Sequence, residues 1–166
     1  YDTQVPSLEF YLKDRLTQSA AYTNSAMVDV VIGTYSVDVV SWIISEEHSD
    51  TPSEISGPWN SKPSVYSLSS GDGTKTVYLW CKDRAGNIGS STATITLDTI
   101  KPIIILNSPA QSGVSNENIV LNYSLSESVG SGTLVLSFTR TGGTADTPHT
   151  VTIGSITAGS HEMMLS

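Results

Sequence analysis

The sequence has few of the residues on which many functional classes depend. It contains a single cysteine, Cys81, and only eight lysines and arginines against sixteen acidic residues, which gives a net charge of −8. One cysteine excludes an intrachain disulfide and cysteine-rich zinc sites. The acidic balance argues against a phosphate backbone as partner, because nucleic-acid binding requires a concentrated basic face. We therefore expect no nucleic-acid partner and a core that is held together by packing alone.

Long apolar runs and helix signals are also scarce. No apolar stretch approaches the roughly 20 residues that a membrane-spanning helix needs, so we expect no transmembrane segment in these residues. Residue 1 is not a methionine followed by a basic and apolar leader, and the sequence stops within the apolar run Met163-Met164-Leu165. We expect this chain to be a piece of a longer polypeptide, with any signal peptide or anchor outside it.

The sequence does contain a repeat. The segment Asp2-Thr3-Gln4-Val5-Pro6 recurs as Asp98-Thr99-Ile100-Lys101-Pro102, which begins 98 − 2 = 96 positions later. A period of about 100 residues suits one antiparallel β-sandwich. The repeat predicts two domains, over residues 1–98 and 99–166, and the second has too few residues for a complete copy.

Short apolar/polar alternations follow the start of each copy and predict β-strands. They lie at residues 8–12, 28–32, 40–44, 66–68, 75–82 and 93–97 in the first copy, and at 119–125, 134–138, 150–153 and 161–165 in the second. Residues 46–63 are rich in Ser, Asp, Pro and Gly and read as a long connection. The fold class expected is all-β, with two tandem antiparallel β-sandwiches, the second incomplete.

The strand at residues 75–82 carries different side chains on its two faces. Val77, Leu79 and Cys81 alternate with Tyr78 and Trp80. We favour the assignment that places the three smaller residues in the core and the two aromatic residues outside, although the pattern also allows the reverse. On that assignment Cys81 is a small buried apolar group, and Tyr78 and Trp80 form an exposed binding surface.

Three sequence signatures coincide in the first copy. They are Asp-Thr-x-x-Pro at the start, the Gly-Asp-Gly-Thr segment at residues 71–74, and Lys-Asp-Arg-Ala-Gly-Asn at residues 82–87. Together they resemble the bacterial immunoglobulin-like (Ig-like) repeats of large cell-surface and adhesin-type proteins. The resemblance covers residues 2–98, whereas in the second copy only the opening segment and the strand around Tyr123 are similar. The second copy is therefore either truncated or of a different subtype.

The resemblance implies a non-enzymatic stalk or ligand-presenting segment of a protein that a bacterium or archaeon exports, located extracellularly or at the cell surface. Its partners would be neighbouring Ig-like domains of the same chain and a surface glycan or protein ligand. Some members of the family are stiffened by calcium between domains. The resemblance implies no catalysis.

Calcium is the metal best suited to the acidic residues. Asp98 lies at the expected domain junction, and Asp83 and Asn87 lie on a turn that could reach one end of the same domain. Oxygen ligands from two or three loops are a common calcium arrangement. The competing interpretation is that Asp83 to Asn87 is simply a favourable hairpin turn, because the sequence has no EF-hand spacing.

Catalysis has little support in the sequence. The three histidines, His48, His149 and His161, accompany no Gly-x-Ser-x-Gly elbow. Glu46 and Glu47 are adjacent, so on an extended strand their carboxylates point to opposite faces and cannot flank one glycosidic bond. We expect the protein not to be an enzyme.

Two alternatives to the spacer interpretation remain open at this stage. A carbohydrate-binding module of a secreted polysaccharide-active enzyme would use Trp59 or Trp80 as a stacking platform, whereas a Trp59 that folds back onto the sandwich would oppose it. A second alternative treats the short second copy as an open sandwich that a strand from a partner completes.

Overall fold

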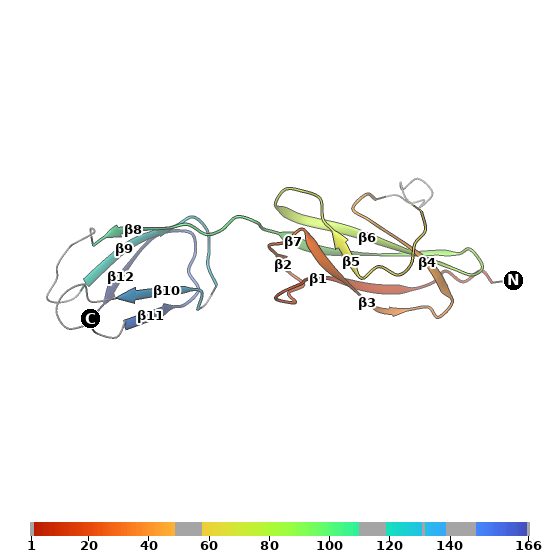
Figure 1. Cartoon of the computed structure of the whole chain (residues 1–166), viewed down its shortest axis with the longest axis horizontal. Helices are drawn as coiled ribbons and strands as arrows, with labels where there is room; N and C mark the ends of the chain where they lie inside the picture. The colour runs from red at the N-terminus through yellow and green to blue at the C-terminus, as the bar shows by residue number, and fades with distance from the viewer. Residues whose placement is uncertain (1, 49–57, 110–118, 131, 139–148, 166) are drawn as a thin grey trace. The chain divides into compact units, whose positions relative to one another are not determined.

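The computed structural model describes residues 2–48, 58–109, 119–130, 132–138 and 149–165. Within these ranges every regular element is a β-strand (Figure 1). The chain divides into two compact units, Tyr1–Ile100 and Lys101–Ser166. The boundary expected from the repeat lies two residues earlier. The all-β prediction is confirmed for the described part of the chain.

Unit 1, defined as Tyr1–Ile100, forms two sheets. One sheet has the order β1-β3-β5 and the other β2-β7-β6-β4. All neighbouring strands are antiparallel except β2 and β7, which are parallel. The seven strands are β1 (Leu8–Asp14), β2 (Tyr22–Thr23), β3 (Met27–Tyr35), β4 (Val39–Ser45), β5 (Val65–Ser67), β6 (Gly73–Asp83) and β7 (Ile88–Leu97).

The main core of unit 1 lies between these two sheets. Alternate residues of each strand point inward, as the period of two requires. The prediction that Val77, Leu79 and Cys81 face the core is confirmed, and Cys81 is a buried free cysteine. The buried members of the core are Leu8, Phe10, Leu12, Val28, Val30, Trp42, Leu68, Val77, Leu79, Cys81, Ile95 and Leu97.

One strand face differs from the prediction. A strict alternation over residues 40–44 would place Val40 on the same inner face as Trp42 and Ile44, but the pairing of β4 with β6 shifts between Val39 and Ser41. Val39 packs against the core in place of Val40, which is exposed. A bulge of this kind inserts one residue and moves the next side chain to the opposite face.

The β6–β7 hairpin runs the length of unit 1. Gly73 pairs with Leu97 at one end, and Lys82 pairs with Ile88 at the other. Gly71 before β6, Gly73 at its first position and Gly86 in the hairpin turn have positive φ angles of 91°, 123° and 94°, which favour glycine. At about 3.3 Å per residue, the ten residues of β7 separate the two ends by roughly 30 Å.

Unit 2, defined as Lys101–Ser166, also forms two sheets in its described residues. One has the order β12-β9-β8 and the other pairs β10 with β11, all antiparallel. Its core contains buried Leu121, Tyr123 and Leu125. The strands are β8 (Ile104–Ser108), β9 (Ile119–Leu125), β10 (Leu134–Phe138), β11 (His149–Ile153) and β12 (Gly159–Leu165).

The described residues contain no helix that is long and apolar enough to cross a membrane.

Candidate cation site and aromatic cluster

The turn between β6 and β7 is organised around a buried carboxylate. Asp83 Oδ1 accepts a hydrogen bond from the Asn87 backbone N–H, and Asp83 Oδ2 accepts one from Asn87 Nδ2, both at 2.8 Å. Burial alone would raise the pKa of Asp83. The hydrogen bonds from Asn87 and from the backbone of Gly86 and Ala85 outweigh burial, so the pKa is lowered and the carboxylate remains charged.

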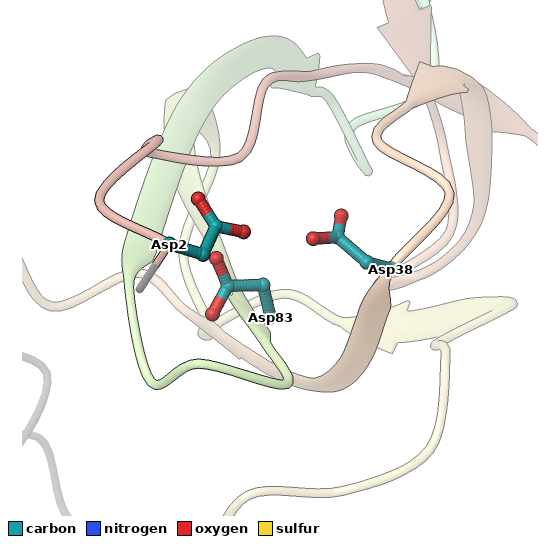
Figure 2. A group of neighbouring side chains, drawn as sticks. All are labelled: Asp2, Asp38 and Asp83. Atoms are coloured by element: carbon teal, nitrogen blue, oxygen red, sulfur yellow. The ribbon is translucent and has the colours of Figure 1, made fainter.

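Two further carboxylates lie beside Asp83. Asp2 comes from the segment before β1, and Asp38 from the link between β3 and β4. One carboxylate oxygen from each of the three residues lies within 4.8 Å of the others. Figure 2 shows the three side chains turned toward one another from three separate segments. Three negative charges at this spacing repel one another unless a cation or solvent screens them.

The spacing of these oxygens fits a calcium ion. Calcium binds oxygen at 2.3–2.6 Å, so two oxygens on the same ion lie at most about 5 Å apart. Asp2 and Asp38 also line a hollow of about 370 Å³ with Gln4, Pro6, Ser36 and Val37. The residues that could hold a cation are therefore Asp2, Asp38 and Asp83.

The grouping of Asp98 with Asp83 and Asn87 is wrong. Asp83 and Asn87 belong to the end of the hairpin that contains Lys82 and Ile88, whereas Asp98 follows Leu97 at the opposite end. There Asp98 lines a different hollow with Asp14 and Thr23. The ten residues of β7 prevent the three predicted ligands from meeting.

The two copies of the repeated aspartate have the same local conformation. Asp2 Oδ1 accepts the Gln4 backbone N–H at 2.9 Å, and Asp98 Oδ1 accepts the Ile100 backbone N–H at 3.2 Å. Each is an Asx turn, in which the side chain bonds the backbone two residues on. The repeated motif therefore has a conformational role in both copies.

Trp80 lies on the outer face of its sheet but is not exposed. The residue has a relative exposure of 4%, and it forms a small second cluster with Ile43, Trp59 and Tyr78. The prediction that Trp80 points away from the main core is confirmed, and the prediction that it is exposed is wrong. The segment that carries Trp59 folds back onto the sheet and covers it.

The neighbouring rings of this cluster are also engaged. Tyr78 stacks on Trp80 at a centroid distance of 5.8 Å and meets His48 edge-on at 4.8 Å. Lys82 Nζ lies 4.3 Å from the centroid of the Trp59 ring, which is a cation–π distance. Trp59 and Tyr78 are only partly buried. This arrangement is a second packing layer rather than an open platform of parallel rings.

Asp14 is a buried carboxylate that the sequence analysis did not single out. Its Oδ1 accepts the backbone N–H groups of Leu16 and Thr17 at 3.0 and 2.7 Å, and its Oδ2 accepts the Thr23 hydroxyl at 2.8 Å. The Thr17 backbone and Thr23 bonds lower the pKa of Asp14 to about 2. The Asp-x-x-Thr spacing at residues 14–17 was a local signal for such a turn.

Comparison of the sequence with protein-family models and with curated proteins finds no match.

Proposed function

We propose that this chain is a non-enzymatic structural spacer of an extracellular or surface-anchored bacterial or archaeal protein, and that its units are tandem Ig-like β-sandwiches. The strand pairing of unit 1 supports this proposal. β1 pairs with β3, β3 with β5, β4 with β6 and β6 with β7, and the short β2 runs parallel to β7. This set of neighbours is the one expected when an Ig-like domain has a first strand divided between its two sheets.

The main support for the spacer role comes from the hydrogen bonds that hold the two ends of unit 1. Asn87 Nδ2 donates to the Asp2 carbonyl oxygen at 3.3 Å, at the hairpin end of β6 and β7. At the other end, the Thr99 backbone N–H and hydroxyl both donate to Asp72 Oδ1, at 3.0 and 2.8 Å. The chain therefore enters and leaves unit 1 at opposite ends of one long hairpin and is tied to a turn at each end.

A distance measurement tests this role. Spin labels on Gln4→Cys and Ile100→Cys, both at exposed positions, would report the separation of the two ends of unit 1, since Cys81 is buried. We expect one narrow distance distribution, centred at roughly 30 Å or more. Asp72→Ala removes the hydrogen-bond acceptor of Thr99 and should broaden the distance distribution. Ser70→Ala in the same turn should leave the distribution narrow. A broad distance distribution in the labelled protein that retains Asp72 and Ser70 would exclude a stiff spacer.

The aromatic cluster supports the spacer over the carbohydrate-binding alternative. A sugar-stacking platform needs ring faces that are open to solvent. Trp80 is buried, and Lys82 lies over the ring of Trp59. Trp80 is therefore not available as a stacking platform for a glycan.

Cation binding at Asp2, Asp38 and Asp83 is a second candidate role, favoured by the spacing of their oxygens. Because Asp2 lies where the chain enters unit 1, a calcium ion there would tie that segment to β6 and to the link before β4. Calorimetric titration with calcium tests it directly. Heat of binding that disappears in Asp38→Asn supports this role, and the absence of heat in the parent protein rejects it.

A further inference from the structure

β8 is an edge strand of unit 2 whose side chains are open on both faces. In the sheet order β12-β9-β8, its outer edge pairs with no strand of the described residues. Ile104 and Leu106 lie on one face and are 46% and 57% exposed, and Ile105 on the other face is 56% exposed. Ile103, just before the strand, is 60% exposed. Residues 103–106 therefore present apolar surface on both faces of a sheet edge.

The pairing of β8 with β9 determines which backbone groups face the outer edge. The Ser126 N–H donates to the Ile103 carbonyl oxygen at 3.0 Å, and the register of β8 on β9 is regular from Ile104 to Leu106. In an antiparallel pair, hydrogen-bonded and non-hydrogen-bonded positions alternate. Ile105 is therefore the next residue bonded to β9, and the N–H and C=O groups of Ile104 and Leu106 point to the outer edge.

The outer edge lacks, within residues 103–106, the features that usually prevent an edge strand from pairing. Proteins block such edges with charged side chains, proline or a bulge. β8 contains no charged residue. Pro102 lies before residues 103–106, and the register shift of β8 comes after Leu106. The edge is therefore open to pairing over a short stretch and is blocked beyond it.

The chemistry of the edge indicates what kind of strand would pair with it. The partner strand has to be apolar, uncharged and free on one edge, and β8 of a second copy has these properties. β10 also has a free edge and no charged residue in the described part of the chain. However, Leu134 and Leu136 of β10 already pack against the core of unit 2. Pairing through β8 therefore covers more apolar surface than pairing through β10.

We propose that β8 pairs antiparallel with β8 of a second copy of this chain, with Ile105 at the centre of the contact. In this register Ile104 lies opposite Leu106 of the second copy, and the two residues exchange both backbone hydrogen bonds. The three-stranded sheets of the two copies join into one sheet with a two-fold axis at Ile105. Because the paired stretch is short, the dimer is reversible. This inference goes beyond the spacer role and does not depend on it.

Disulfide trapping in the 166-residue chain tests the proposed register. Ile105→Cys places two thiols in a non-hydrogen-bonded pair, whose Cα atoms lie about 4.5 Å apart, a separation that a disulfide spans. Ile103→Cys is the matched control, because Ile103 is similarly exposed but its two copies lie four residues apart along the strands, at about 13 Å. The native Cys81 is buried. We expect Ile105→Cys to form disulfide-linked dimers at least roughly tenfold faster than Ile103→Cys, and equal rates would overturn the proposal.

Sedimentation analysis tests the dimer without an added cysteine. We expect the parent protein to convert reversibly from monomer to dimer as its concentration rises from micromolar to millimolar. Ile105→Lys sets two like charges opposite each other and should weaken the dimer at least roughly tenfold. Val135→Lys on β10 is the control, because Val135 is 50% exposed, and it should leave the dimer unchanged.

Three results of the sedimentation experiment would overturn the proposal. A parent protein that stays monomeric throughout would show that β8 does not pair with itself. A dimer that Ile105→Lys leaves unchanged would place the contact outside β8. Loss of the dimer in Val135→Lys would assign the contact to β10.

Discussion

The backbone of Pro6 lies directly against Gly89 of β7. A Cβ atom built on Gly89 would lie 1.8 Å from the Pro6 carbonyl oxygen and 2.9 Å from its carbonyl carbon. Both residues are buried. The segment before β1 is therefore seated on β7 at a point where only glycine leaves enough space.

We predict that Gly89→Ala destabilises unit 1. The methyl group cannot be accommodated unless the Pro6 backbone moves, and overpacking of this kind costs about 1–3 kcal/mol. Gly33→Ala in β3 is the control, because its Cβ would meet the Glu9 oxygen and the Tyr11 ring at 3.8 Å, an ordinary contact distance. Urea unfolding of the two variants measures the difference. Equal stabilities would show that Pro6 is not held against β7.

Asp14 should make unit 1 sensitive to acid. Its pKa is lowered from 3.8 to about 2 in the folded protein, so it contributes stability above its unfolded pKa, and this contribution is lost as the pH falls from about 4 to 2. Asp14→Asn should unfold more easily at pH 7, by about 1–3 kcal/mol for the lost hydrogen bonds to a charged group. It should also lose less stability than the parent below pH 4.

Thermal melts at pH 7, 4 and 2 check the behaviour of Asp14. Asp29→Asn is the control, since Asp29 forms an exposed ion pair with Arg15 at 3.2 Å, and such pairs contribute about 0–1 kcal/mol. A pH profile of Asp14→Asn parallel to that of the parent would contradict the prediction.

The carboxylates of Asp2, Asp38 and Asp83 should lower the stability of unit 1 without calcium and raise it when calcium is bound. In chelator and low salt, Asp38→Asn should raise the melting temperature by a few degrees because it relieves repulsion from Asp2 and Asp83. With millimolar calcium the parent should gain stability by mass action, and the variant should not. Glu162→Gln in unit 2 is the charge control, and a calcium response that survives Asp38→Asn would place the ion elsewhere.

A mechanical prediction follows from the parallel pairing of β2 with β7. The Thr96 N–H bonds the Ala21 carbonyl and the Asp98 N–H bonds the Thr23 carbonyl, both at 2.9 Å. When the two ends of unit 1 are pulled apart, the force acts parallel to the strands and shears these hydrogen bonds, so they must break together. Asp98→Pro removes one donor and should lower the unfolding force in single-molecule pulling.

Asp98→Ala is the control for the pulling experiment, because it keeps the backbone N–H and loses only the side-chain bond to Ile100. Equal unfolding forces for the proline and alanine variants would show that the β2–β7 bonds do not resist the load.

The sequence alone located most of the strands, because alternation is a local property. It also placed Val77, Leu79 and Cys81 in the core. It did not predict the burial of Trp80, because that depends on Trp59 folding back over the sheet from about twenty positions earlier in the chain. Nor did it join Asp2 and Asp38 to Asp83, since three separate segments meet there only after the sandwich forms.

The error at Asp98 was of a different kind, since the information to avoid it was available. Asp83 and Asn87 precede a ten-residue strand and Asp98 follows it, so extended geometry alone separates them by roughly 30 Å. No sequence signal marked Gly89. The requirement for glycine at this position arises from the packing of the Pro6 backbone against β7.

The attachment of Asp2 and Thr99 to turns at opposite ends of the β6–β7 hairpin has a consequence for how such a protein can vary. Sequence changes in either turn can alter how that end of the chain is held, while the interior of unit 1 stays the same. The two attachments can therefore diverge independently, because roughly 30 Å of hairpin separates them.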